Sequence, residues 1–596
     1  MRRLSILALT IAFSLLPAVA RADHVPPGLG VLPGPLPAPP SVLSEGPIRW
    51  VSNTSTGRSF AGTLGEVTPF TRDGKQYLVA GSSVYGFAVI DVTNPAAPVT
   101  ISEYASAFGC PNSPLMQVTD PAWNQDPFDI ALGYGGWEND ISWSPDGRWV
   151  VMGMDAPGRC HDPIFGGIEI VDLSDVTNPK LVHLVRNNGQ SHSVTLDPLH
   201  PWLAYISTSD SEDVLYIVDF KMCADVPAGA CAPTVAAAVF DFDYWPALYD
   251  KNKEGENKDK TTSGCHDLRF YKDRAYCASV GSTMILDVSK VSEATGRLSG
   301  THLTEGADAC SLVDADPVYA SGIKVTDCRN WHKDVFRDRK AKVVNIPLLS
   351  VIDHDGDKPA NEDISIAHQA EAIADGQIMM VTDERGGGLG TDLCPGGGVW
   401  FYDIRDERNP VLMKQPDGSP GVYMTQWNIP NVLGQNPSCT VHYGKEFADE
   451  NLLTFGWYTN GMRVLRYFPD FSKTPAQIRF EEIAGFAGLD LTIDSMVMAR
   501  NPDNEDEVLV YAANVLRGVD VFAVEAPRLT RAAAFGGAKV PAPSKKPAGK
   551  PAVRGTKTTK GGPSLPGTGA GDPMVLALII LAGSLAVRSL SRKTSG

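Results

Sequence analysis

The stretch GIEIVDLSDVTNPKLVHLV, residues 167–185, decides the fold. A glycine is followed by a run of β-branched residues, which has the composition of a β-strand. The Asp and the Asn-Pro pair after it have the chemistry of a turn. Similar phrases recur six more times, at residues 86–104, 214–220, 283–290, 398–414, 461–478 and 518–524.

A predicted hairpin precedes each phrase. Residues 141–153 (ISWSPDGRWVVMG) and 370–383 (AEAIADGQIMMVTD) are examples in which a polar turn joins two apolar runs. One such unit cannot bury both its faces, so neighbouring units must stack around an axis. The sequence therefore predicts an all-β fold, a seven-bladed β-propeller of four-stranded blades over residues 48–526. Long insertions at 105–136, 241–263 and 300–365 are expected to form loops over one face.

The N-terminal residues 1–22 are typical of a signal peptide. Arg2 and Arg3 precede an apolar run over residues 4–16, and Ala20 to Ala22 supplies small residues for cleavage. The alternative is a membrane anchor, but the run is shorter than the ~20 residues that a spanning helix needs. Residues 23–47 are rich in Pro and Gly and are expected to form a flexible linker.

The C-terminal residues carry a second targeting signal. A spacer rich in Pro, Lys and Gly covers residues 527–564, and residues 565–596 contain LPGTG, an apolar segment and a basic tail. This order resembles an LPxTG sortase signal, which implies cleavage between Thr568 and Gly569 and attachment to the cell wall by a sortase-type transpeptidase. The alternative is a permanent membrane anchor. Both place the body outside the cell, at the wall or membrane surface.

The repeated phrase resembles the LVIVD-repeat family, as in residues 168–172 (IEIVD). The resemblance covers roughly residues 60–525. Three stretches resemble an exported bacterial subgroup of that family: CHDLRFYKDRAYCASVGSTMILDVS, AHQAEAIADGQIMMVTDERGGG with a later Cys, and a Cys followed by VHYGKEFADENLLTFGWYTNG. The resemblance implies an exported propeller and does not imply a settled activity.

Charge and cysteine content narrow the possible partners. The net charge of −17 argues against nucleic acid, because phosphate repels such a surface. The chain has ten cysteines, and in an exported protein an even number points to disulfides. Spacing does not fix their connectivity. Our working hypothesis is sequential pairing, with Cys265–Cys277 and Cys394–Cys439 as the foremost pairs.

Aligning the hairpins on their turns reveals a recurring polar position. It lies seven residues before the turn Asp, as in His266 before Asp273 and His368 before Asp375. The first strand of a propeller blade lines the central channel, so equivalent positions should lie around one axis. Imidazoles with a carboxylate suit Zn, Cu or Fe. The candidate ligands are His192, His266, His368, His442 and Glu66.

Two alternatives to this metal site stay open. The histidines can instead form hydrogen bonds between blades and close the ring, or their alignment can be a coincidence. A separate and weaker metal candidate is Ca²⁺ at Asp353, Asp355 and Asp357, which alternate as in calcium loops. Gly356 is misplaced for an EF-hand and position twelve lacks a carboxylate, so a plain acidic loop is the competing interpretation.

The sequence supports two hypotheses of function. The first is a non-enzymatic binding or scaffold protein, displayed on the envelope, that engages a protein or glycan through its loops. The alternative is a metal-dependent extracellular enzyme, an oxidoreductase or hydrolase, with a histidine-lined site in the central channel. No catalytic residue can be assigned by motif, since no GxSxG occurs.

Overall fold

The computed structural model describes most of the predicted propeller body. The described residues are 43–54, 64–82, 86–106, 141–154, 167–186, 191–207, 215–224, 226, 231, 233–240, 265–297, 304–305, 339–340, 342–354, 362–385, 396–425, 439–488, 492–514 and 517–528. The chain divides into two units, Met1–Arg554 and Gly555–Gly596, and every described residue belongs to the first.

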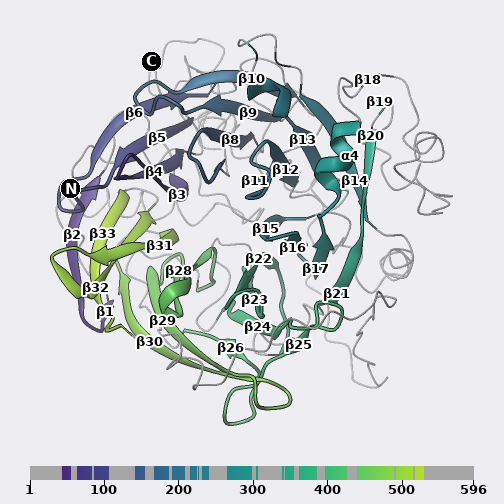
Figure 1. Ribbon diagram of the computed structural model, residues 1–596. Helices are drawn as coiled ribbons and strands as arrows, with labels where there is room; N and C mark the ends of the chain where they lie inside the picture. Colours follow the sequence, from purple (N-terminus) through teal and green to yellow (C-terminus); the bar gives the residue numbers. More distant parts are fainter. Residues whose placement is uncertain are drawn as a thin grey trace, which may run out of the picture. The chain divides into compact units, whose positions relative to one another are not determined.

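These residues form a seven-bladed β-propeller, as predicted (Figure 1). Blade 1 contains β3 (Leu64–Arg72), β4 (Lys75–Ser82), β5 (Gly86–Asp91) and β6 (Val99–Ala105). Blade 2 contains β7 (Ile141–Trp143), β8 (Trp149–Met154), β9 (Gly167–Asp172) and β10 (Lys180–Arg186). Blade 3 contains β11 (Ser193–Leu196), β12 (Leu203–Ser207), β13 (Tyr216–Asp219), β14 (Thr234–Phe240) and, parallel to β14, β20 (Lys342–Ile346).

The remaining blades follow in chain order. Blade 4 contains β15 (Asp267–Tyr271), β16 (Arg274–Ala278), β17 (Ser282–Asp287) and β21 (Leu348–Asp353). Blade 5 contains β22 (Ala367–Ile373), β23 (Ile378–Asp383), β24 (Val399–Asp403), β25 (Val411–Leu412) and β26 (Val422–Tyr423). Blade 6 contains β27 (Gly444–Phe447), β28 (Leu452–Gly456), β29 (Met462–Asp470), β30 (Gln477–Ala487) and β1 (Leu43–Glu45). Blade 7 contains β31 (Thr492–Asn501), β32 (Asn504–Asn514), β33 (Gly518–Glu525) and β2 (Ile48–Thr54).

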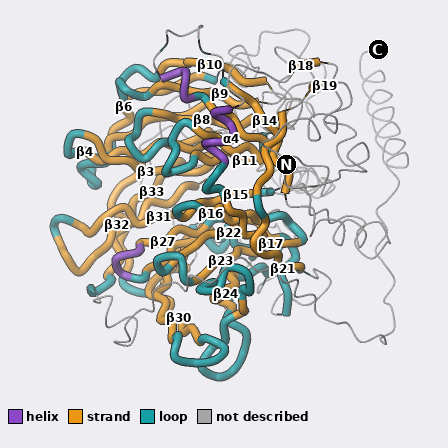
Figure 2. Tube along the Cα trace, turned by 45° about the vertical axis from the view of Figure 1, so that its right-hand side comes forward, coloured by secondary structure: helices purple, strands orange, loops and turns teal. Residues whose placement is uncertain are grey.

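Little else in the described chain is regular. The helical elements are α4 (Val291–Arg297), η2 (Lys221–Ala224) and η4 (Ala448–Glu450), and β18 (Thr304–Glu305) pairs with β19 (Arg339–Lys340) in a two-stranded antiparallel sheet. Figure 2 shows how strands dominate the described trace. None of the helices within these residues is long and apolar enough to cross a membrane.

The seven repeated phrases form the third strand of the seven blades, which are β5, β9, β13, β17, β24, β29 and β33. The Asp of the phrase ends the strand in six blades, because its carboxylate accepts a hydrogen bond from the backbone N–H two residues later. In blade 2, for example, the N–H of Ser174 lies 2.7 Å from Asp172 Oδ1. This Asx turn gives the repeated Asp a structural role.

The core lies between the blades. Seven hydrophobic clusters are formed by the described residues, and each joins two neighbouring blades. The cluster between blades 7 and 1, for instance, packs Tyr511 and Val521 against Leu78 and Ile90. Each blade therefore buries both faces against its neighbours, which is the reason the units must close into a ring.

The ring is closed by the N-terminal strands. β2 pairs antiparallel with β33, so the first strand of the body becomes the fourth strand of the last blade. Trp50 Nε1 and Asn53 Nδ2 both donate to Asp520 Oδ1 at 3.0 Å. β1, which lies at the end of the predicted 23–47 linker, adds to blade 6 through β30.

Candidate metal centre

Four histidines occupy equivalent places at the inner edge of consecutive blades. The backbone N–H groups of His192, His266 and His442 each donate to a carbonyl at the end of the second strand of their own blade, 2.6–2.9 Å away. In blade 5, Ala367 pairs with Asp383 and Gln369 pairs with Thr382, so His368 is the extra residue of a β-bulge. Bulges re-aim side chains, and they are common beside functional sites.

The four imidazole rings form a continuous arc. Ring centroids are 4.4 Å apart between His192 and His266, 4.6 Å between His266 and His368, and 4.3 Å between His368 and His442. All four side chains are buried, and His368 is 0% exposed. The four histidines of blades 3 to 6 thus lie next to one another, as the alignment of the hairpins predicts.

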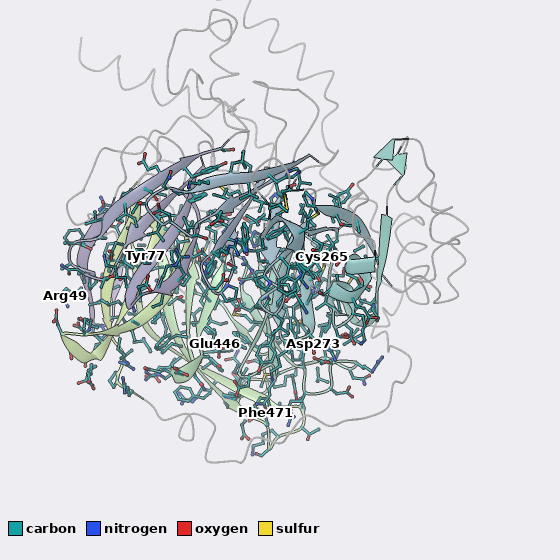
Figure 3. All side chains as sticks on the ribbon, turned by 45° about the horizontal axis from the view of Figure 1, so that its top comes forward. Arg49, Tyr77, Cys265, Asp273, Glu446 and Phe471 are labelled. Carbon is teal, nitrogen blue, oxygen red and sulfur yellow. A yellow bond between two sulfur atoms is a disulfide. The ribbon has the colours of Figure 1, made fainter. Side chains whose placement is uncertain are left out.

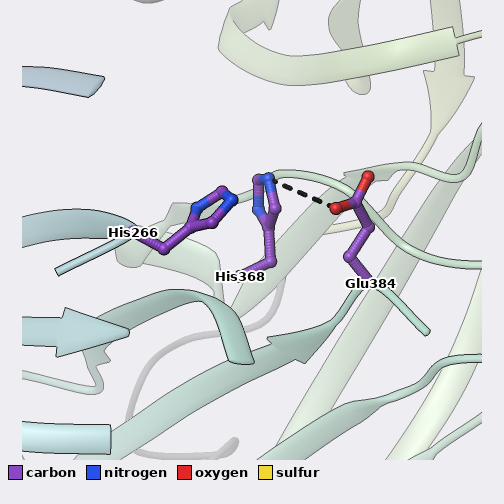
Figure 4. Close-up of side chains that lie close together, drawn as sticks. All are labelled: His266, His368 and Glu384. Atoms are coloured by element: carbon purple, nitrogen blue, oxygen red, sulfur yellow. Dashed lines mark ion pairs between the residues drawn. The ribbon is translucent and has the colours of Figure 1, made fainter. Parts of the chain in front are cut away.

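A carboxylate completes a group of residues that could hold a metal ion. One ligand atom from each of His266, His368 and Glu384 lies within 4.8 Å of the other two (Figure 4). His368 Nε2 and Glu384 Oε2 are 3.9 Å apart. Two atoms bound to one zinc ion can be at most ~4.3 Å apart, given bonds of ~2.0–2.2 Å. His368 Nε2 and Glu384 Oε2 are therefore close enough to bind the same ion without moving. A pair of ligand atoms 4.8 Å apart would need to approach by about 0.5 Å.

The backbone that carries Glu384 is firmly held. Asp383 Oδ1 accepts hydrogen bonds from the N–H groups of Ser365 and Ile366 at 3.1 and 2.9 Å, and the N–H of Glu384 donates to the Ile366 carbonyl at 3.0 Å. Thr440 Oγ1 donates to the Asp383 carbonyl at 2.8 Å. Burial raises the pKa of Asp383 to about 7, because it outweighs the two backbone donors.

A glycine permits this close approach. A Cβ on Gly397 would lie 1.7 Å from the Asp383 carbonyl oxygen and 2.4 Å from Thr440 Oγ1. Only glycine leaves the space that brings this part of blade 5 against blade 6. The glycines that the sequence places just before β24 therefore support the position of Glu384.

The predicted ligand Glu66 belongs to a different polar group. Its carboxylate lies 3.1 Å from Arg269 Nη1 and 3.2 Å from Lys445 Nζ. Lys445 Nζ is also 2.6 Å from Asp494, and Asp494 accepts the N–H of Val67 at 3.0 Å. These contacts link blades 6, 7, 1 and 4 at their inner strands.

Charges within this polar group alter the protonation of its members. Burial alone would lower the pKa of Lys445, but the charges of Asp494 and Glu66 outweigh it and raise that pKa. Burial raises the pKa of Asp267, whose carboxylate is 2.9 Å from Arg269 Nε. Lys445 is therefore held as a cation in the interior by the carboxylates on either side of it.

The structure brings together part of the predicted ligand set. His266 and His368 join Glu384 in the metal-capable group, His192 and His442 extend the arc at either end, and Glu66 contacts cations instead. In the sequence, Glu384 belongs to a glycine-rich stretch, DERGGGLG, that reads as a loop at the blade edge. It lies directly after the second strand of blade 5, and no other blade has a glutamate at that position.

The structure tests some of the predicted disulfides but not others. Two disulfides of the predicted sequential pairing are confirmed, Cys223–Cys231 and Cys265–Cys277. Figure 3 labels Cys265 and Asp273, which lie two residues before and two residues after β15. Cys439 is disulfide-bonded, but Cys394 lies outside the described residues, so that pairing stays a prediction.

Several other predictions fall on undescribed parts of the chain. Asp353 ends β21, whereas Asp355 and Asp357 lie outside the described residues. The same is true of the signal peptide, of most of each long insertion, and of the cleavage position at Thr568 and Gly569. These stay predictions from the sequence.

Comparison with known proteins finds similar chains among solved structures. No protein-family model and no curated protein match the chain. The β-propeller domain of Cps50 (Swd1) from Myceliophteria thermophila aligns with 80% of this chain and 100% of its own, at 10% identity and a TM-score of 0.39. A protein from Lactobacillus plantarum aligns with 78% of this chain and 97% of its own, at 10% identity and a TM-score of 0.37. Neither likeness bears on activity.

Proposed function

We propose that this chain is an exported propeller, attached to the cell envelope, that binds a transition-metal ion in its central channel through His266, His368 and Glu384. The propeller fold itself is consistent with a binding or scaffold role. The observation that carries the metal proposal is the buried two-histidine, one-carboxylate group, whose ligand atoms lie within 4.8 Å of one another.

The donor chemistry favours a particular class of ion. Imidazole nitrogen suits Zn, Cu and Fe, whereas Ca²⁺ takes six to eight oxygen ligands. Burial of a carboxylate costs free energy, and a divalent ion bound to it would offset part of that cost. Glu384 is 0% exposed, so a metal ion bridging it to the two imidazoles would offset the cost of its burial.

Metal analysis of the purified protein, produced without an affinity tag, tests this proposal. We expect about one transition-metal ion per chain, and we expect the double variant His266→Ala/His368→Ala to lose it. His200→Ala is the matched control, because His200 lies in the turn between β11 and β12 and bonds Asp197 at 2.9 Å. Metal-free protein from several growth media supplemented with Zn, Cu or Fe would refute the proposal.

The proposed location has its own test. The signal-like residues 1–22 and the LPGTG segment support export followed by envelope attachment. A variant that lacks residues 565–596 should appear in the culture medium, whereas the full chain should stay with the cells. Retention of the truncated chain at the surface would refute attachment through this segment.

A metal-dependent enzyme is the second candidate function. It is favoured by the number of ligands, because catalytic zinc sites have three protein ligands and keep a further position open for water or substrate. Azide added to the Co²⁺-loaded protein should then alter the visible absorption of the ion. An unchanged spectrum at saturating azide would indicate a closed structural site and would favour the scaffold role alone.

A further inference from the structure

We propose that Tyr458 is a positioning residue of this metal centre, which holds one oxygen of Glu384 and leaves the other as the metal ligand. This inference rests on the proposed function, since it requires a metal ion at the histidines. It assigns a role to a residue that the histidine alignment does not detect.

The contacts divide the two oxygens of the Glu384 carboxylate. The Tyr458 hydroxyl donates a short hydrogen bond to Oε1. Oε2 is the atom that lies 3.9 Å from His368 Nε2. The hydrogen bond to Oε1 fixes the side chain in the orientation that turns Oε2 toward the imidazoles, so Oε2 is the oxygen best placed to bind an ion.

The position of Tyr458 is itself fixed from several sides. Its side chain is 2% exposed, and its ring centroid lies 5.2 Å from that of His442. Its carbonyl accepts the N–H groups of Gly461 at 2.9 Å and Thr492 at 3.0 Å. The phenol is therefore held by the turn between β28 and β29 and by blade 7.

The backbone of Tyr458 has an uncommon conformation. Its φ is +42°, which is in the left-handed region that bulky side chains rarely adopt. Such strain persists where the surrounding structure over-determines it, and it concentrates at functional sites. A conformation that directs the hydroxyl to Glu384 is consistent with a role at the site.

The division of the carboxylate also bears on which ions bind. Ca²⁺ favours many oxygen ligands, often with both oxygens of one carboxylate. Two imidazoles and a single carboxylate oxygen instead suit Zn²⁺, Co²⁺ or Fe²⁺. Tyr458 thus adds to the selectivity that the histidines provide.

Binding of Co²⁺ and Zn²⁺ to the Tyr458→Phe variant tests the proposal, by titration calorimetry and Co²⁺ absorption. Loss of a residue that orients a metal ligand typically weakens binding ~10–100-fold, and we expect that loss together with an altered Co²⁺ spectrum. Tyr511→Phe is the matched control. Tyr511 is a buried tyrosine of the same hydrophobic cluster, and its hydroxyl has no hydrogen bond among the described residues.

The outcomes separate this inference from the proposed function. Wild-type protein that binds neither ion refutes the metal centre and, with it, the role of Tyr458. Wild-type protein that binds metal while Tyr458→Phe keeps the same affinity and spectrum refutes only the role of Tyr458. A structural role alone would lower the melting temperature and leave the Co²⁺ spectrum unchanged.

A second pair of variants covers the case in which Tyr458→Phe does not fold. In Glu384→Gln, the Tyr458 hydroxyl should hold the amide oxygen, so the amide nitrogen, which is not a ligand, would face His368. We therefore expect Glu384→Gln to bind metal as weakly as Glu384→Ala. Binding more than about tenfold tighter in the Gln variant, equivalent to ~1.4 kcal/mol, would overturn the proposal.

Discussion

Replacing Glu371 with Gln should stabilise the propeller at alkaline pH and leave it unchanged in acid. Glu371 lies on the inner strand β22, where Gln369 Nε2 donates to its carboxylate at 2.9 Å. Burial raises the pKa of Glu371 to about 7, although the positive charge of Arg269 acts to lower it. The folded protein therefore binds a proton at pH values where the unfolded chain has lost it.

The sign and size of the effect follow from linkage. Below the ordinary glutamate pKa of 4.5, Glu371 is protonated in both the folded and the unfolded state, so it does not lower the stability of the wild type. Between pH 4.5 and about pH 7, the unfolded state binds fewer protons than the folded state, so the free energy of unfolding falls as pH rises. The interval is about 2.5 pH units, and at ~1.4 kcal/mol per unit the upper bound is about 3.5 kcal/mol. Glutamine avoids this cost because it carries no charge.

Urea unfolding followed by near-ultraviolet circular dichroism measures the difference. At about pH 8 we expect Glu371→Gln to be more stable than the wild type by ~2–3 kcal/mol, and at about pH 4.5 we expect equal midpoints. Glu103→Gln, at an exposed position of β6, is the control and should not differ from the wild type. Equal stability of Glu371→Gln and wild type at pH 8, or an advantage that persists in acid, would refute the reasoning.

Three further predictions concern the links within the ring. The Cys265–Cys277 disulfide closes a separation of 12 residues, so its removal by Ser substitution should cost ~3 kcal/mol in chemical unfolding; an unchanged midpoint would contradict this. Asp494→Ala should lower the free energy of unfolding by ~3 kcal/mol, because it leaves the Lys445 cation with one fewer buried partner. The double variant Lys445→Met/Asp494→Leu should recover part of that stability. A double variant no more stable than Asp494→Ala would count against the charge argument. Deletion of residues 43–54 should expose the edges of blades 6 and 7 and produce oligomers in size-exclusion chromatography; a stable monomer would show that these strands are dispensable.

The architecture could be predicted because the repeat is local. Six of the seven third strands begin at or just after a glycine and six end in an Asp, and the Asx turn that follows uses only the next few residues. Once one unit is recognised, the others follow from the pattern. Three blades have a fifth strand that was not predicted, β1, β20 or β26. The pairing of β1 and β20 depends on where the chain enters and returns between blades.

The site could be predicted only where it follows the repeat. His266 and His368 occupy a position that recurs in every hairpin, so alignment of the turns found them. Glu384 directly follows a second strand, and no other blade has a glutamate there, so alignment of the repeats did not single it out. Glu66 shares the register of the histidines, but Arg269 and Lys445 lie within 3.2 Å of it and determine its role. Such pairing depends on side chains from other blades, which spacing along the chain does not reveal.

The closure of the ring by β2 also constrains when the protein can become native. Trp50 and Asp520 are 470 residues apart in the chain and bond across the final seam. Synthesis at ~5–20 residues per second delivers them roughly half a minute to a minute and a half apart. During that interval β2 lacks β33, the strand with which it pairs in the native fold. Contacts of such long range form late, so the final seam of the ring cannot close until the last blade has been made.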